Sequence, residues 1–597
     1  MNSSDINKNF WRVKTGLFQE TLIRVCLFVS VLVVINTCYT LYLNYWHGPF
    51  RDMWEIFPFL IDAVESRWHW GELWALYGGA HRLVVPKLLY VADYQWFAGN
   101  NHLLLLTSVV CQIFITVFFF KAIWVQGTDS KECRTESSRP IKYLMSAFVL
   151  ALQFSATLMF NFLHTFDVQW FTCCLFIVIC FFVLLLPVKH SIALLYLSLF
   201  FGLLATMSNF AGMAFWPVWL VLVLKKGYSW KTVALVFAVS SIYILCYVSA
   251  MSGVHSSDLD KPFFELLLFL FVFFLFPALF LSSPLSEFHP FAGAFLSVPV
   301  LMLLARFWWL YLVRKQQFPR ICVFFAALAL FCYGVSAEIA LGRWYGPEHY
   351  HASRYQNIVV MFWSAFFCLW LSLPESVFRV FFSRLNFAGF LARKKIVLCT
   401  SVFVVIFVAY QYPSTSQAYS MGTNVRLAHL AFTLGYSDKV PLIMATKSRH
   451  WAGIEWHNFN REYQFMKDHG VGPMSEPAYR LYESGLPSGQ YLKKLPICPG
   501  LGKVRIFPHV ETAVIQFSVT LDTAFMSEYA PSSIHVFSDG RPLGYAIPYY
   551  EREPLAHFKK SLSGEGVKFF GYLTDQPARS ILMLAGSGGR YVCKLSN

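Results

Sequence analysis

Charged residues are scarce in this chain of 597 residues, where they make up 14% of the sequence. Soluble domains carry roughly 25% charged residues, so this scarcity excludes an ordinary soluble protein. The chain also lacks, over most of its length, the short segments of alternating hydrophobicity that are typical of membrane β-barrels. Its apolar runs are instead long and continuous, and the mean hydropathy is +0.50. This pattern predicts membrane-spanning helices, which satisfy their backbone polar groups internally.

The sequence has no CxxC pair and no His-x-x-x-His spacing, so no metal site is predicted. Twelve of the fourteen cysteines lie in or beside apolar runs, where cysteine usually serves as a small hydrophobic residue. The other two, Cys498 and Cys593, bracket the C-terminal part of the chain. We predict that they form a disulfide in an oxidising compartment. Two buried free thiols are the alternative.

The formal net charge of +15 does not indicate a nucleic-acid partner, because no basic and aromatic recognition module accompanies it. Much of the excess lies in short turns between apolar runs, and basic residues in such turns favour the cytoplasmic side of a membrane. These basic turns are 8–14, 131–142, 225–231, 314–320 and 379–395. We therefore expect the N-terminus inside and the chain after Tyr412 outside.

Apolar runs of about 20 residues are long enough to cross the hydrocarbon core. The sequence predicts about eleven transmembrane helices, at 22–43, 102–124, 143–162, 168–188, 191–208, 211–224, 231–251, 291–312, 321–341, 356–373 and 396–412. A crossing at the apolar segment 263–281 would place the basic turn 314–320 outside. We interpret that segment as a re-entrant or interfacial helix interrupted by Pro277, with a twelfth span as the alternative. The predicted fold is an α-helical polytopic membrane domain over 1–412.

The sequence changes character after residue 412. Residues 413–499 mix charged and aromatic residues with helical stretches and predict a largely helical connecting segment. From Lys503 onward, hydrophobic and polar residues alternate between turn residues, and Asp539-Gly540 is typical of a tight β-hairpin. We predict a small β-sandwich over 500–597, on the outer side of the membrane.

Carboxylates gather in the loop after the first predicted span, residues 44–82. They are Asp52, Glu55, Asp62, Glu65 and Glu72. Charged groups near lipid are costly, so such a cluster indicates a functional site. Asp52 and Glu55 lie closest to the end of the span, and a spacing of three residues would place them on one side of a helical turn. A carboxylate there could act as a general base, although a helix cap is the alternative for any one acid.

The other outer loops supply polar and mostly cationic residues. The candidates are His81, Arg82, Lys87, Asp167, Arg343, His349, His351, Arg354 and Tyr355. Arginine makes planar, bidentate contacts with phosphate, and aromatic rings suit a lipid headgroup level or a sugar face. Cations here would stabilise a departing lipid phosphate while the first loop supplies the base. Solvated histidines and an interfacial belt of aromatic residues are the alternatives.

Four tracts occur in a characteristic order: the acidic loop after the first span, the His-Arg pair before VPKLLY (85–90), SNFAGMAFWP (208–217), and GRWYGPEHYHASRY (342–355). In this layout the chain resembles bacterial polytopic glycosyltransferases with a GT-C-type fold. It is similar in plan to the serotype-converting enzymes that add glucose to O-antigen from polyprenyl-phosphate sugars. The resemblance covers roughly residues 20–412 and, more loosely, the chain to about 475.

The resemblance implies inverting transfer of one hexose from an undecaprenyl-phosphate sugar to a periplasmic glycan such as lipopolysaccharide, in the bacterial inner membrane. It implies no cofactor, with a divalent metal left open, and a flippase and a donor-lipid synthase as partners. The catalytic acid would fall on Asp52, with Glu55 second. Phosphate contacts would fall on Arg343, Arg354, Tyr355, Arg82 and Lys87, and substrate contacts on His81, Asp167, His349 and His351. The family's acidic residue before the His-Arg pair is replaced here by Ala80.

Three other functions stay open. An O-antigen polymerase or ligase would have its large outer loop between late spans, whereas the large polar part here is terminal. A transporter or flippase of lipid-linked sugars would show broken helices, midplane charges or internal repeats. A glycan-binding scaffold would use the C-terminal domain as its working part.

Overall fold

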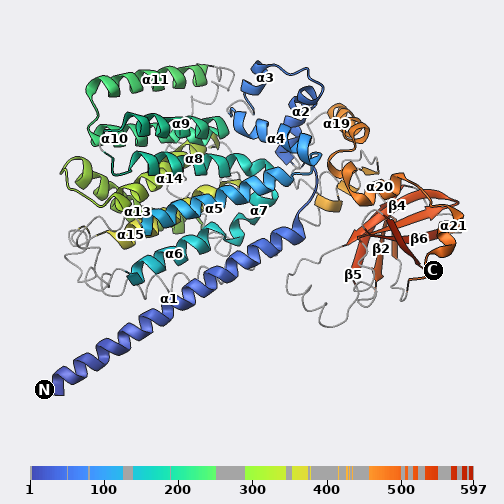
Figure 1. The fold of residues 1–597 in the computed structure, drawn as a ribbon, viewed down its shortest axis with the longest axis horizontal. Coiled ribbons are helices and arrows are strands. Elements are labelled where there is room, and N and C mark those ends of the chain that lie inside the picture. The colour runs from blue at the N-terminus through green and yellow to red at the C-terminus, as the bar shows by residue number, and fades with distance from the viewer. Residues whose placement is uncertain are drawn as a thin grey trace.

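The computed structural model describes residues 3–49, 51–77, 81–124, 139–188, 190–249, 289–343, 353–373, 377, 415, 425–427, 429–430, 433–434, 456–498, 505–508, 515–521, 532–548, 567–574, 581–587 and 590–595. Among these residues, helices occur up to Lys494 and the named strands begin at Arg505. Figure 1 shows the helices as a bundle with the strands beyond one of its ends. The predicted segments 263–281 and 396–412 lie outside the described residues.

The described helices are mostly long in the first half of the chain and short in the C-terminal part. They are α1 Ser3–Asn44, α2 Phe57–Val64, α3 Trp70–Trp74, α4 Val84–Phe97, α5 His102–Trp124, α6 Arg139–Gln153, α7 Met159–Leu163, α8 Val168–Leu184, α9 Ile192–Ser208, α10 Phe215–Lys226, α11 Trp230–Ser249, α13 His289–Leu312, α14 Arg320–Arg343, α15 Gln356–Ser372, α19 Trp456–His469, α20 Pro477–Glu483 and α21 Gly489–Lys494. Short 3₁₀ helices connect them: η1 Arg51–Ile56, η5 Ala156–Leu158, η6 Thr165–Asp167, η7 Phe210–Ala214, η11 Ser353–Tyr355 and η13 Gly472–Ser475.

Six of these helical stretches are long and apolar enough to cross a membrane. They are Glu20–Asn44, His102–Trp124, Arg139–Leu163, Thr165–Leu184, Trp230–Tyr247 and Arg320–Ile339. Three shorter apolar stretches, Ile192–Ser208, Val300–Leu312 and Gln356–Ser372, coincide with further predicted spans. These helices are compatible with the predicted multi-pass membrane protein. The total of about eleven spans stays a prediction.

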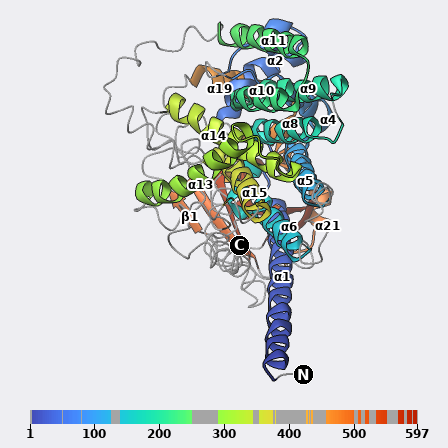
Figure 2. The same cartoon turned by 90° about the vertical axis from the view of Figure 1, so that its left-hand side faces the viewer.

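Central and peripheral helices differ in what they expose. Helices α8 and α14 are almost entirely buried in the bundle core, where for example Phe171 and Phe324 have no exposed surface. Helix α1 instead presents Phe28 and Tyr42, which are 63% and 82% exposed, on the side that does not pack on the bundle. Figure 2 shows its N-terminal part extending beyond the other helices. Exposed apolar side chains of this kind suit a lipid solvent.

The buried side of α1 is held by hydroxyl groups. Ser30 donates to the carbonyl of Ala147, at 2.9 Å, and Thr37 donates to the carbonyl of Phe154, at 2.5 Å. Ala147 lies within α6, and Phe154 directly follows this helix. Interhelical hydrogen bonds of this kind stabilise helix pairs in lipid, where apolar surface alone gives little preference for one neighbour.

The strands are β1 Arg505–Pro508, β2 Ile515–Leu521, β3 Ser533–Ser538, β4 Arg541–Pro548, β5 Val567–Leu573, β6 Ile581–Ser587 and β7 Arg590–Leu595. They form one antiparallel half-barrel sheet in the order β1-β2-β5-β4-β3-β6-β7. Asp539 and Gly540 form the tight turn between β3 and β4, both at positive φ, so the predicted hairpin is confirmed.

The predicted β-sandwich is corrected by this topology. The long-range pairs β2–β5 and β3–β6 join all described strands into one sheet, so no second sheet faces it among them. One face of the sheet buries Val519, Val536 and Phe569 in a core of its own. On the other face, Phe537 and Tyr591 pack with residues of the short helical segment 481–495 instead of a facing sheet.

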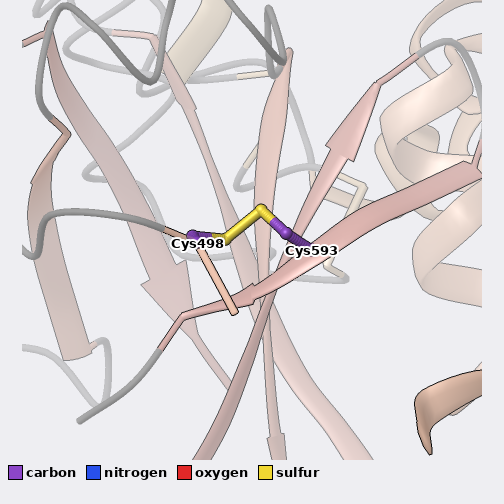
Figure 3. Close-up of a disulfide and its surroundings, with 2 residues drawn as sticks. All are labelled: Cys498 and Cys593. Atoms are coloured by element: carbon purple, nitrogen blue, oxygen red, sulfur yellow. A yellow bond between two sulfur atoms is a disulfide. The ribbon is translucent and has the colours of Figure 1, made fainter. Parts of the chain in front are cut away.

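The predicted disulfide between Cys498 and Cys593 is confirmed (Figure 3). It joins Cys498, which comes before the sheet in the sequence, to Cys593 in the last strand, β7. Next to it, the N–H group of Cys498 donates to the carbonyl of Lys594 at 2.7 Å. The helical segment before the sheet is thereby fixed along its final strand.

Candidate functional site

The loops that were predicted to lie on one side of the membrane meet at one end of the bundle. In Figure 1, α2, α3 and α4 lie at this end, close to α19. Contacts between distant segments confirm the grouping of the described parts. Thr165 donates to the sulfur of Met53 at 3.1 Å, and the N–H group of Phe210 donates to Nδ1 of His81 at 3.4 Å. Trp170 packs edge-on against the ring of Tyr355.

Asp52 and Glu55 lie in the 3₁₀ helix η1, which has three residues per turn and therefore three rows of side chains. The first row, Met53 and Ile56, packs in an apolar cluster with Phe166. The second row, Trp54 and the following Phe57, packs in a different cluster with residues of the C-terminal part. Asp52 and Glu55 occupy the third row. The backbone of η1 thus places these two positions on one side of the helix, as predicted.

A buried acid lies next to the row that faces the bundle. Asp167, the last residue of η6, has no exposed surface, and its Oδ2 lies 3.1 Å from Nδ1 of His164. Its Oδ1 has no hydrogen-bond partner among the described residues. The flanking Phe166 and Val168 pack in the same apolar cluster as Met53. A buried carboxylate at the rim of a helical bundle, with one oxygen available, can bind a hydroxyl group.

Amide side chains connect the helices behind this acid. Asn161 donates to the side chain of Asn357 and to the carbonyl of Arg354, the latter at 3.1 Å. Asn209 donates to the side chain of Gln169 at 2.7 Å. These contacts fix η11 and η7 against α7 and α8. They hold the backbone of Arg354 at the bundle end, where its guanidinium lies 5.7 Å from the centre of the Tyr355 ring.

Arg82 and Lys87, two predicted phosphate ligands, are buried and bind the end of helix α3. Lys87 donates from Nζ to the carbonyls of Glu72, at 2.7 Å, and Ala75, at 3.2 Å. Arg82 donates to the carbonyl of Trp74, and its guanidinium lies between the rings of Trp74 and Tyr247, 5.0 and 5.2 Å from their centres. Cations at the carbonyl end of a helix are favourable, so both residues stabilise this loop.

The remaining acids of the first loop are paired at the surface. Asp62 binds Arg67 at 3.0 Å and Arg461 at 3.3 Å. Glu65 pairs with Arg67, and Glu72 lies 3.1 Å from His69. All four pairs are partly exposed. Burial lowers the pKa of nearby Lys87 to about 8, against the opposing effect of the Glu72 carboxylate.

Two of the predicted residues cannot be placed in the site. His349 and His351 lie outside the described residues. Arg343 is the last residue of α14, and the structure describes only its backbone.

Sequence reasoning did not assign a role to Glu338 or Tyr247. Glu338 lies in α14 and its Oε2 is buried without a hydrogen-bond partner among the described residues. Tyr247 of α11 has no exposed surface and accepts a hydrogen bond from the N–H group of Arg82 at 3.1 Å. An acid inside an otherwise apolar span was the available signal for Glu338; Tyr247 had none.

The site has the parts for acid–base and phosphate chemistry, and no cluster of metal-ligating residues occurs within the described ranges. No protein-family model matches the chain, and neither a curated protein nor a solved structure matches it.

Proposed function

We propose that this protein is a membrane glycosyltransferase that moves one hexose from a polyprenyl-phosphate sugar to a glycan on the outer side of a bacterial inner membrane. The observation that supports this function best is the position of η1. The helix bearing Asp52 and Glu55 packs beside the buried acid Asp167, at the bundle end where Arg82 and Arg354 also lie. Acids for the hydroxyl and cations for the phosphate are therefore grouped.

The proposed reaction is a single displacement. The acceptor hydroxyl oxygen bonds to the anomeric carbon while the bond from that carbon to the phosphate oxygen breaks. Asp52 takes the hydroxyl proton, and the electron pair of the broken bond leaves with the lipid phosphate. Arg354 and Arg343 stabilise that charge, with Tyr355 beside them. One displacement inverts the anomeric configuration.

Arg82 and Lys87 would serve the donor phosphate by exchanging partners. Both cations now bind neutral backbone carbonyls. A phosphate carries a full negative charge that the carbonyls lack and attracts these cations more strongly, so an arriving phosphate can displace the carbonyls. A pKa of about 8 keeps Lys87 largely protonated at pH 7. His81 and Asp167 are the described substrate-binding candidates, and His349 and His351 complete that set.

The test is Asp52→Asn in the full-length protein, reconstituted in vesicles with polyprenyl-phosphate glucose and a surface glycan. We expect sugar transfer to fall by roughly 10²–10⁴-fold, the contribution of a general base. Glu65→Gln is the matched control, because Glu65 pairs with Arg67 at the surface. Unchanged transfer by Asp52→Asn would overturn the assignment of the base. Movement of intact donor across the bilayer without transfer would instead establish a flippase.

A further inference from the structure

The C-terminal part of the chain contacts the backbone that leads into η1. We define the joint as residues 44–49 and 98–102 of the helical bundle together with 425–434 and 461–482. Nε2 of His429 bonds to the carbonyl of Pro49 at 2.9 Å. The N–H group of Gly472 donates to the carbonyl of Ala98 at 2.8 Å. Segments far apart in the sequence are thus joined by one side-chain and one main-chain hydrogen bond.

Gly48 makes the closest approach across the joint. Its φ is +103°, a conformation that favours glycine. A Cβ atom at this position would lie 2.5 Å from Cδ and 2.6 Å from Cγ of Pro473. The carbonyl of Gly48 also accepts a hydrogen bond from the side chain of Asn101. The main chain at Gly48 is therefore confined between the two parts of the protein.

The same side of the joint continues into η1. Arg51, where η1 begins, follows Gly48 by three positions, so a shift of the main chain at Gly48 is passed on directly. The second row of η1 then packs on the C-terminal part: the rings of Phe57 and Phe465 meet edge-on, and Trp54 shares their cluster. Both the entry to η1 and one of its faces depend on this contact.

We propose that the C-terminal part positions the acids of η1 for sugar transfer, and that Gly48 and Pro473 are the positioning residues of this contact. The inference rests on the proposed function. It assigns to the described residues around His429 and within 461–482, and to the attached sheet, a role within the transfer reaction, separate from any binding of glycan by the sheet. The direction in which the Asp52 row of η1 faces is determined by the other two rows, one packed on the bundle and one on the C-terminal part.

The test compares Gly48→Ala, Pro473→Ala and the double variant with Gly470→Ala, all in the full-length protein in vesicles. Replacing Pro473 by alanine removes Cγ and Cδ, the two atoms that a Cβ added at Gly48 would strike. Gly470 is the control for a glycine at positive φ without a clash, because its φ is +61° and nothing lies within 4 Å of an added Cβ. The readouts are hydrogen exchange in peptides covering 51–64 and the kcat and KM of sugar transfer.

We expect Gly48→Ala to increase exchange over 51–64 and to lower kcat by roughly tenfold or more with little change in KM. The double variant should recover the part of both changes that arises from the clash with Pro473, since the strain of alanine at φ +103° remains, and Gly470→Ala should change neither. Unchanged exchange in Gly48→Ala, or faster exchange with normal kcat, would overturn the inference. Faster exchange that the double variant reverses, with no transfer by any variant or by the unaltered protein, would support the joint while refuting the glycosyltransferase function.

Discussion

The two packed rows of η1 differ in what they contact. The row of Met53 and Ile56 contacts residues of the helical bundle between Leu83 and Val168, in a small apolar cluster. The row of Trp54 and Phe57 contacts residues some 400 positions later, beside a group of titratable side chains. The first contact belongs to the bundle, whereas the second requires the C-terminal part to be in place. The same short helix therefore has one contact within the bundle and one that adjoins the buried histidines His47 and His429.

The largest expected effect on stability comes from shortening one side chain in each packed row of η1, in separate variants. Phe57→Ala should lower the free energy of unfolding by about 3–5 kcal/mol, because it removes a buried ring from the contact with the C-terminal part. Met53→Ala should cost about 2–3 kcal/mol. Thermal unfolding in detergent measures both.

Hydrogen exchange separates the two variants. Phe57→Ala should speed exchange in peptides covering 461–482, and Met53→Ala should leave those peptides protected. Equal loss of protection in both variants would contradict the division of η1 into two contacts.

The next effect is the pH dependence of the joint. Burial lowers the pKa of His429 to about 4, against hydrogen bonds to the carbonyls of Pro49 and His47 that raise it. Burial also lowers the pKa of His47 to about 4, and the nearby groups of His102, His429 and Arg426 contribute to the same decrease. The titratable and charged groups around these imidazoles are Tyr45, Asp93, His102, Arg426 and Glu476.

A histidine whose pKa is depressed in the folded state stabilises the fold in its neutral form. That contribution is complete above pH 6.5 and is lost as the pH falls toward 4, by about 3 kcal/mol for His429. Glu476 acts in the opposite direction, since burial raises its pKa to about 7 and its contribution is lost as the pH rises from 4.5 to 7. Burial also raises the pKa of Asp93, which therefore acts in the same direction as Glu476. The two large histidine shifts outweigh these two acids, so acid should loosen the joint.

His429→Gln should reduce this acid sensitivity, because an amide can still donate to the carbonyl of Pro49 but does not titrate. Unfolding midpoints measured from pH 7.5 to 4.5 test the expectation. The exposed His69, exchanged for Gln in parallel, should leave the pH profile unchanged. A profile for His429→Gln that coincides with that of the unaltered protein would show that the acid sensitivity arises elsewhere.

The smallest expected effect is that of the surface pair across the joint. Arg461 and Asp62 lie 3.3 Å apart, with their side chains 51% and 29% exposed. Arg461→Met should therefore cost less than about 1 kcal/mol, and less again at high salt. A larger loss in a low-salt and high-salt comparison of unfolding would place this pair among the main contacts of the joint.

The helices, the hairpin and the disulfide could be predicted because their signals are local or positional. Apolar runs predicted the described apolar helices, and Asp539-Gly540 predicted the turn between β3 and β4. The arrangement of the sheet could not be predicted, since alternation shows that a strand has two faces but not what covers each. Residues of the helical segment around Leu481 cover the face that a second sheet was expected to bury.

The candidate site divides in the same way. The spacing of Asp52 and Glu55 predicted their common row, whatever the type of helix. The contacts of Lys87 with backbone carbonyls had no local signal, because they depend on the fold of α3 beside α4. The approach of Gly48 to Pro473 joins residues from opposite ends of the chain, and a single sequence contains no trace of such a pair.

The three-residue repeat of η1 also constrains how this protein can change over evolutionary time. Substitutions along η1 alter one row and leave the others in place. An insertion or deletion of one residue turns every later position by a third of a turn, since a 3₁₀ helix has three residues per turn. Such a change would move Glu55 into a row that now packs apolar side chains. The length of the loop before Phe57 should therefore vary far less among descendants of this sequence than its composition.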